Sequence, residues 1–411
     1  MHQPLLEIFR HQNASGVAYK NKALKRAIIT HLDNVSNTTI ADLNKELNIS
    51  TPKIINLINE LIQDELIKDF GKVDSTGGRR ANMYGLESKA GYFVGIDVKQ
   101  YVINAGLLNF KKQLITIEEA IPYILENSHK AFEELIRIIR EFINSLPVDK
   151  EKILSICINL SGRINNTTGY SYSFFHFQEE PLAATLQNRL GIKVFLENDS
   201  RAMAYGEFNS GVVSNEKNVL FVNMDYGTGL GILVDGKMYY GKSGFSGEFG
   251  HIPFFDNEIM CHCGKKGCLE TEASGYALLR LFKEKIGEGS SSQLVGKFPD
   301  PGQVKLEHII DAAQNDDMLC IELIAQLGEK FGKGLAILIN IFNPELVILG
   351  GTLAQTGDLI KLPAKSALNK YSLSLVNNDT MLKMSKLGEK AGVMGGCLIA
   401  RNNVFLKRVA E

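Results

Sequence analysis

Apolar residues recur at helical spacing in three stretches of the first 64 residues. The stretches are residues 22–31, residues 39–47 and a segment that begins at Thr51-Pro52 and runs to Asp64. This spacing predicts amphipathic helices, and proline is tolerated in a first helical turn because its missing N–H would be unpaired there. The residues of the third helix expected to face inward are Ile54, Leu57 or Ile58, and Leu61.

Two short strand-like segments, residues 66–70 and 83–86, follow these helices and flank a tip with the sequence Gly77-Gly78-Arg79-Arg80. Three helices followed by a hairpin are the pattern of a winged helix-turn-helix. Arginine on a flexible glycine tip can enter a minor groove or bind phosphate. The alternative is a small helical domain that contacts only protein. Under the DNA-binding hypothesis, the contacting residues are expected to be Thr51, Lys53, Asn56, Arg79 and Arg80.

From Gly91 onward, strand-like and helical segments alternate. A strand, an aspartate, a loop and a second strand occur in this order at Asp97 and again at Asp225. The alternation is typical of an α/β protein. The repeated pattern predicts two related α/β lobes that face each other across a cleft, with both aspartate loops at its mouth.

The charge is nearly balanced, with 45 Lys and Arg against 46 Asp and Glu in 411 residues. This balance excludes a histone-like protein that binds polyanions over its whole surface. Residues 1–90 carry 12 basic against 10 acidic side chains, so non-specific DNA affinity should be weak. The N-terminus lacks the apolar core of a secretory signal, and no apolar run reaches the roughly 18 residues of a membrane span. We therefore expect a soluble, cytoplasmic protein without membrane partners.

Cys261, Cys263 and Cys268 lie within eight residues of one another, ten residues after His251. Three thiolates and one imidazole satisfy tetrahedral zinc, and four protein ligands leave no open position, so the sequence predicts a structural zinc. His262 is a rival fourth ligand, although both of its neighbours are already ligands. The remaining cysteines stand singly in apolar segments and are expected to be buried small hydrophobic residues: Cys157, Cys320 and Cys397.

The sequence resembles the ROK family, which contains bacterial sugar kinases and sugar-responsive transcriptional repressors. The motifs that carry the resemblance are Gly247-Glu248-Phe249-Gly250-His251, the Cys-x-Cys-Gly-x-x-Gly-Cys-Leu-Glu run at 261–270, the loop from Asp225 to Gly231, Glu197-Asn198-Asp199, and Asn343-Pro344-Glu345 with Gly350-Gly351. The N-terminal segment resembles that of the repressor branch. Glu65 departs from the pattern, because family members usually place glycine there, at the end of the recognition helix.

The resemblance implies a two-lobed, actin-like and ribonuclease-H-like α/β sugar-kinase fold preceded by a winged helix-turn-helix. The expected division is a DNA-binding domain at 1–88, a first lobe at 89–200, a second lobe with the zinc knuckle at 201–390, and a C-terminal helix at 391–411 that packs back on the first lobe.

The resemblance also implies a sugar site. In the family, sugar hydroxyls are held by the residues at the positions that match Asn198, Asp199, Glu248, His251 and Glu270. The glycine that matches Gly162 approaches the sugar ring through its backbone. Carboxylates and amides suit vicinal hydroxyls because they make paired hydrogen bonds. His251 would use one ring nitrogen for zinc and the other for sugar. Asp199 matches the general base of the kinase members.

Kinase members bind phosphate with Asp-x-Gly-Gly-Thr after the first strand, whereas this chain has Asp97-Val98-Lys99-Gln100-Tyr101. Without glycine, side chains occupy the space where backbone N–H groups should approach phosphate. The second glycine loop, residues 227–231, is intact. We therefore expect no kinase activity and no catalytic residues.

The sequence thus favours a sugar-responsive regulator, most simply a repressor of carbohydrate-metabolism genes. Its expected partners are operator DNA and a sugar or amino-sugar effector, and a palindromic operator would require a homodimer or homotetramer. Two alternatives stay open. One is an ATP-dependent sugar kinase that carries a DNA-binding domain. The other is a regulator that responds to a protein, such as a subunit of a transport system.

Overall fold

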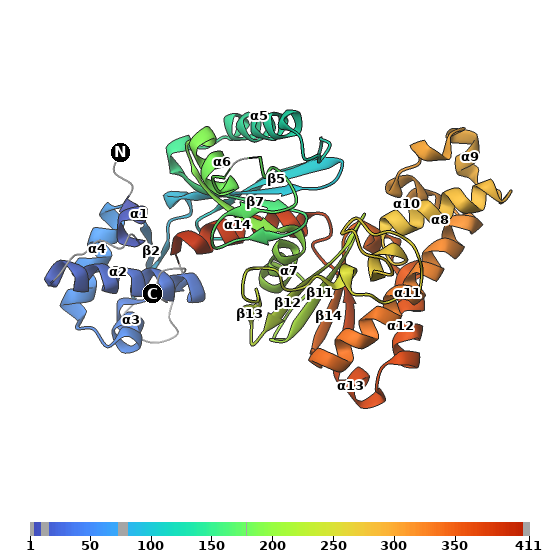
Figure 1. Cartoon of the computed structure of the whole chain (residues 1–411). Coiled ribbons are helices and arrows are strands. Elements are labelled where there is room, and N and C mark those ends of the chain that lie inside the picture. Colours follow the sequence, from blue (N-terminus) through green and yellow to red (C-terminus); the bar gives the residue numbers. More distant parts are fainter. Residues whose placement is uncertain (1–3, 10–15, 73–80, 178, 406–411) are drawn as a thin grey trace.

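The computed structural model describes residues 4–9, 16–72, 81–177 and 179–405. Three bodies follow one another in Figure 1: a helical domain at the N-terminus, a central α/β lobe and a second α/β lobe. The expected wing tip with Arg79 and Arg80 lies in residues 73–80, which are outside the described residues.

The N-terminal domain combines four helices with a small antiparallel sheet. The predicted helices are confirmed, and the inner side chains of the third one are all buried, with both Leu57 and Ile58 in the core. The sheet has the strand order β1-β3-β2, as in a helix-turn-helix with a β-hairpin wing. The elements are α1 Pro4–Phe9, α2 Val17–Val35, β1 Asn37–Thr38, α3 Ile40–Leu47, α4 Thr51–Gln63, β2 Ile67–Lys72 and β3 Asn82–Leu86.

Helix α4 ends at Gln63, and Glu65 has a backbone φ of 54°. This left-handed conformation is one that glycine adopts without a steric penalty. Glu65, which replaces the glycine usual in the family, therefore adopts the backbone conformation that a glycine would have at this position. The Glu65 carboxylate lies 3.2 Å from the Lys152 ammonium of the first lobe.

The first lobe is a five-stranded sheet with the order β10-β7-β4-β5-β6. Alternate residues of β4 explain its two covered faces: Val94 and Ile96 pack toward α5 and α6, whereas Phe93 lies on the face toward α14. The elements are β4 Tyr92–Val98, β5 Val102–Asn109, β6 Leu114–Pro122, α5 His129–Ser145, β7 Ile153–Leu160, β8 Ile164–Asn165, β9 Tyr170–Ser171, α6 Leu182–Leu190 and β10 Lys193–Asn198.

The second lobe repeats this topology with the order β13-β12-β11-β14-β15, and in both lobes the first strand pairs antiparallel with the second and parallel with the fourth. The predicted internal repeat is therefore confirmed at the level of whole sheets. The strands are β11 Val219–Met224, β12 Thr228–Val234, β13 Lys237–Met238, β14 Leu346–Gly350 and β15 Met381–Met384. The helices are α8 Gly275–Gly287, α9 Gln293–Lys297, α10 Leu306–Gln314, α11 Met318–Phe342, α12 Asp358–Tyr371 and α13 Ser374–Asp379.

Two helices connect the bodies (Figure 1). Helix α7, Asp199–Ser210, starts in the first lobe and packs on the β11–β12 face of the second. Helix α14, Lys390–Phe405, packs on β4, β7 and α7 through small residues such as Gly395, which lies against Ala202. At its far end, the Arg401 guanidinium binds the Asp33 carboxylate of α2 at 2.5 Å.

Candidate functional site

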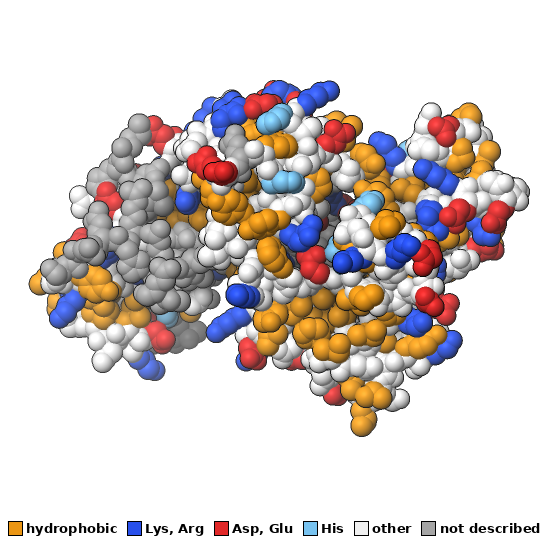
Figure 2. Space-filling view, viewed as in Figure 1, with side chains coloured by type: hydrophobic (Ala, Val, Ile, Leu, Met, Phe, Trp, Pro, Cys, Tyr) orange, Lys and Arg blue, Asp and Glu red, His pale blue; other side chains and the backbone are white. Residues whose placement is uncertain are grey.

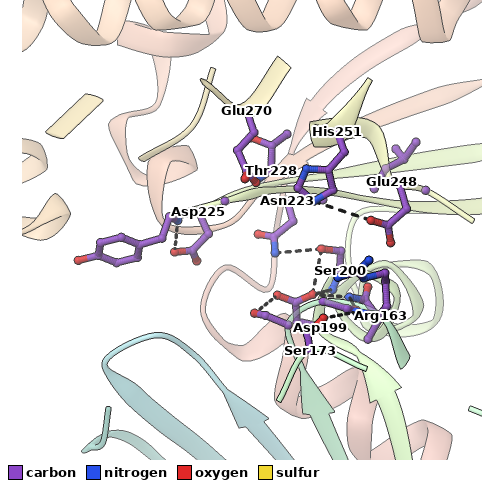
Figure 3. A pocket seen from close by; sticks show the side chains of 18 of the residues that line it. Arg163, Ser173, Asp199, Ser200, Asn223, Asp225, Thr228, Glu248, His251 and Glu270 are labelled. Atoms are coloured by element: carbon purple, nitrogen blue, oxygen red, sulfur yellow. Dashed lines mark hydrogen bonds and ion pairs between the residues drawn. The ribbon is translucent and has the colours of Figure 1, made fainter. Parts of the chain in front are cut away.

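A cavity of about 430 Å³ lies between the two lobes. It is lined by all six residues expected at the sugar site: Gly162, Asn198, Asp199, Glu248, His251 and Glu270. In Figure 3, Asp199 and Ser173 lie on one side of the cavity, and Glu248, His251 and Glu270 lie on the other. In the space-filling view, charged and histidine side chains meet near the middle of the face, between the lobes (Figure 2). The volume is within the range of small-molecule pockets.

Asp199 is held at the start of α7 by hydrogen bonds to both oxygens. The Ser161 hydroxyl donates to Oδ2 at 2.8 Å, and the backbone N–H of Ser200 donates to Oδ1 at 2.8 Å. Asn198 caps the helix by accepting from the N–H of Arg201, and it donates to the carbonyl of Gly162 at 3.1 Å. Asn198 therefore orders the strand–helix junction in addition to lining the cavity.

Gly162 has a φ of 86°, and a Cβ there would overlap the Ser173 hydroxyl. The position therefore needs glycine both for its conformation and for the close approach of the segment around Ser173. This brings backbone to the cavity wall.

Glu270 is positioned by the second glycine loop. The N–H of Thr228 donates to Glu270 Oε2 at 2.9 Å. A Cβ on Gly227 would lie 2.8 Å from the same oxygen, closer than side-chain atoms normally approach. The glycine in this loop thus makes room for a carboxylate of the protein itself.

The four predicted metal ligands form one cluster, whose donor atoms all lie within 4.8 Å of one another. The Cys261 Sγ and His251 Nδ1 are 3.4 Å apart, and the sulfurs of Cys263 and Cys268 are 3.6 Å apart. Metal–ligand distances of about 2.0–2.3 Å around a tetrahedral ion give ligand separations of roughly 3.5–3.8 Å, so the donors fit such an ion. The rival ligand His262 is outside the cluster, with its ring 4.8 Å from that of Tyr276.

His251 joins the cluster to the cavity. Its Nδ1 faces the Cys261 sulfur, and its Nε2 lies 3.8 Å from a carboxylate oxygen of Glu248. The ring therefore has one nitrogen toward the metal donors and the other toward the pocket. A metal held by Nδ1 would fix the orientation of Nε2.

The first aspartate loop is filled by side chains. The Lys99 ammonium forms an ion pair with Glu389 and lies 3.6 Å from the Asp225 carboxylate of the second lobe. Although burial alone would lower it, the fields of Asp225, Glu389 and Asp97 raise the pKa of Lys99 above its usual value. Only 13% of the Lys99 side chain is exposed. The lysine is thus a charged link between the lobes.

Asp97, at the end of β4, is almost completely buried beside this link. Burial raises the pKa of Asp97 to about 7, and Asp199 adds to the rise, whereas Lys99 and a hydrogen bond from Asn159 oppose it. Its Oδ2 atom has no hydrogen-bond partner among the described residues. The carboxyl group is therefore partly protonated near neutral pH.

Several residues of the site were not predicted. Buried Arg201 donates to Glu197 at 2.7 Å and to the carbonyl oxygens of Gly244 and Ile164, which ties α7 to a loop of the second lobe. Glu197 lies near the end of β10 and Arg201 in the first turn of α7, so their contact depends on the strand–helix junction and had no signal in the periodicity of the sequence. Other unpredicted residues lining the cavity are Arg163, Ser173, Ser200, Asn223, Tyr226, His262 and Tyr276.

The residues expected to contact DNA lie on α4. Thr51 and Asn56 are exposed, as a contact with a partner requires. Lys53 is half-buried, and its ammonium donates to the Asn21 side chain of α2 at 2.6 Å. Lys53 therefore stabilises the packing of α4 on α2, and it would have to exchange this partner to reach a phosphate or a base.

The family model described as "ROK family" matches residues 93–403, which include both lobes and the metal-ligand cluster. The chain belongs to the ROK family. A ROK relative, the xylose repressor of Caldicellulosiruptor bescii, is 31% identical and aligns over 89% of this chain and 92% of its own length. The DNA-binding transcriptional dual regulator NagC of Escherichia coli is 27% identical over 97% of both chains.

Solved ROK structures confirm the expected fold. A ROK family transcriptional regulator, a homologue of the Escherichia coli MLC protein, superposes with a TM-score of 0.76 at 26% identity and covers 94% of this chain and 97% of its own. A ROK family glucokinase from Streptomyces griseus, in complex with glucose and AMPPNP, gives a TM-score of 0.67 at 26% identity. It covers 76% of this chain and 100% of its own. Among the described residues, no helix is long and apolar enough to cross a bilayer.

Proposed function

We propose that this ROK protein is a sugar-responsive transcriptional regulator, most simply a repressor, of carbohydrate-metabolism genes. The observation that carries the proposal is the extent of its likeness to repressors. The alignments with the xylose repressor and NagC cover 89% and 97% of this chain, which is more than the two lobes alone. The domain division expected from the sequence is part of the proposal.

The N-terminal domain is the DNA-binding module in this proposal. Helix α4 presents exposed Thr51 and Asn56, which suit a recognition helix in a major groove. Arg79 and Arg80, outside the described residues, are proposed for the wing. A palindromic operator would be bound by a homodimer or by two chains of a homotetramer.

The cavity between the lobes is the proposed effector site. Asp199, Glu248 and Glu270 offer carboxylate acceptors to sugar hydroxyls, and His251 offers its Nε2. Zinc is the proposed metal at the cluster of His251 and the three cysteines, because thiolates and imidazole in a closed set of four are its preferred ligands. When bound, zinc would fix the knuckle that presents His251 and Glu270 to the sugar.

The first aspartate loop argues against phosphoryl transfer as the function. Lys99 and Gln100 stand where kinase members have two glycines, and the Lys99 ammonium is paired with Asp225 and Glu389. A nucleotide phosphate would meet side chains in place of backbone N–H groups. The kinase alternative is tested by incubating the pure protein with ATP and a panel of hexoses. Robust phosphorylation would overturn our interpretation of this loop.

The proposed relay to the DNA-binding domain is helix α14. It packs on α7, which begins at Asp199 in the cavity, and its Arg401 binds Asp33 of α2. A movement of the lobes on sugar binding would be passed through these contacts to α2 and α4. Arg401→Met should abolish the sugar response while leaving sugar binding intact. The matched control is Lys112→Met, which removes the more exposed partner of Asp33.

The function is tested by selecting bound fragments from genomic DNA and then measuring release or tightening of the best fragment by a panel of sugars. Asp199→Asn should remove the sugar response and preserve DNA binding. Asp235→Asn, in the turn between β12 and β13, is the control and should respond like the wild type. If no sugar binds in calorimetry, the alternative regulator that responds to a transport-system protein is favoured.

A further inference from the structure

Two aromatic side chains outside the ROK motifs are exposed where the proposed effector pocket opens to solvent. Tyr172, in the segment that follows β9, lines the cavity and is 50% exposed. Phe245 of the second lobe is 38% exposed and precedes Ser246 and Gly247, which line the same cavity. The two rings are 5.5 Å apart and nearly perpendicular, so an aromatic pair joins the two lobes at the cavity mouth.

Packing within the protein does not explain these rings. A third ring, that of Tyr170, lies 6.2 Å from the ring of Tyr172 and extends the row along the first lobe. None of the three belongs to a hydrophobic core of the described residues. Exposed apolar surface that adjoins a cavity is typical of a ligand-binding groove. The row of rings is therefore a candidate extension of the pocket.

A guanidinium without an ion-pair partner lies beside the row. Arg163 lines the cavity and is exposed, and no acidic group among the described residues pairs with it. Its carbonyl accepts a hydrogen bond from the N–H of Tyr172 at 2.9 Å, so the two residues are neighbours. In Figure 3, Arg163 lies toward the Glu248 end of the cavity, away from Asp225. This end of the pocket thus offers an open aromatic surface and a free hydrogen-bond donor.

We infer that the pocket continues into a second subsite that binds the next ring of an oligosaccharide. Tyr172 and Phe245 pack against the apolar face of that ring, and Arg163 donates to its hydroxyl groups. The inference rests on the proposed function and deepens it, because it makes the effector a disaccharide or a longer chain. It also assigns the three residues as determinants of effector length.

The test compares single sugars with their dimers by isothermal calorimetry on the full-length protein. The pairs are xylose with xylobiose, glucose with cellobiose and with maltose, and N-acetylglucosamine with its β-1,4-linked dimer. We expect one dimer to bind at least about 10-fold more tightly than its monomer, because it adds contact with the aromatic pair and one or more hydrogen bonds.

Variants of the aromatic pair show whether these rings cause the preference. Tyr172→Ala and Phe245→Ala should each reduce the ratio of dimer to monomer affinity by about 3- to 10-fold. Tyr172→Phe keeps the ring and should keep the ratio. Tyr19→Ala is the matched control, because Tyr19 is 49% exposed on α2 of the N-terminal domain, and it should leave the ratio unchanged. Thermal unfolding of each variant checks that it is folded.

The outcomes separate this inference from the proposed function. If a single sugar binds and no dimer binds more tightly than its monomer, the second subsite is wrong and the proposed function stands. If no sugar of either length binds, both fail. If the two alanine variants change the rates of monomer binding but not the affinity ratio, the aromatic pair is a gate across the mouth and the inference is wrong.

Discussion

The two strand–aspartate–strand loops occupy equivalent positions in their lobes, but different side chains fill them. The loop after β4 is filled by Lys99, which pairs with Asp225 across the cleft. The loop after β11 keeps Gly227, and the space that the glycine leaves is taken by Glu270. One loop is thus filled by a cation, and in the other the N–H of Thr228 is already bound by an anion of the protein.

Under the proposed function, a kinase-like fold serves as a sensor and keeps its architecture. The sheet topology of the two lobes is the same, while the first aspartate loop is filled by ion pairs within the protein. Lys99, Asp225 and Glu389 link the two lobes through ion pairs. The predictions below alter first the second loop and its support, and then the first loop.

The largest effect is expected from removing a metal ligand. Cys268→Ser should lower metal content and reduce sugar affinity by about 100-fold or more, because His251 and Glu270 lose the knuckle that orients them. Metal analysis and calorimetry measure both quantities. Cys320→Ala, a buried cysteine outside the cluster, is the control and should keep both. Full sugar affinity without metal would show that the second loop is organised by protein contacts alone.

Removing the lysine of the first loop should mainly affect stability. Lys99→Met leaves Asp225 and Glu389 facing each other without a cation and should lower the free energy of unfolding by about 1–3 kcal/mol. Urea unfolding measures the change. The control is Lys305→Met, whose exposed ammonium lies 5.0 Å from the Tyr101 ring and should contribute about 0.5 kcal/mol. Equal effects of the two variants would argue against a charged link between the lobes.

Asp97 should make stability depend on pH. Its pKa is about 7 in the folded protein and near 3.8 when unfolded, so the folded state holds more protons between these values. The free energy of unfolding therefore falls as pH rises through this window. The stability of Asp97→Asn relative to the wild type should increase from pH 4.5 to 7.5 by on the order of 1–2 kcal/mol. A difference that stays constant with pH would contradict the raised pKa.

The smallest effect is expected from the second loop itself. Gly227→Ala would push Glu270 away from the N–H of Thr228 and should weaken sugar binding by about 3- to 10-fold, the net value of roughly one ordinary hydrogen bond. Gly296→Ala, in α9, has no atom within 4 Å of the added methyl group and should leave the affinity unchanged. Unchanged affinity in Gly227→Ala would mean that the pocket tolerates a displaced Glu270.

Much of the fold could be predicted because the spacing of apolar residues in short segments matches the side chains that the fold buries. The apolar stripe of α4 and the repeated strand–aspartate–strand unit both lie in short segments where periodicity is a direct consequence of burial. The metal cluster was equally accessible, since its ligands are close in sequence except for His251. Helices α8 to α13 were not predicted one by one, because their apolar residues face several neighbours and the periodicity is less clear.

The partners within the site could not be predicted. Glu389 pairs with Lys99 from 290 residues away in the sequence, and Ser173 reaches Gly162 from the segment that follows β9. Such contacts depend on how segments distant in the sequence pack together, which composition and spacing do not encode. The same is true of Lys53, which the sequence assigned to DNA and the structure pairs with Asn21.

Helix α14 begins one residue after Glu389 and holds Asp33 through Arg401, so it is a rigid rod of about 17 Å between the cleft and the first domain. The helical phase fixes the direction of Arg401 relative to Glu389. One alanine inserted near the middle would turn Arg401 by about 100° relative to Glu389, whereas inserting a full heptad would restore the phase almost completely and change only the length.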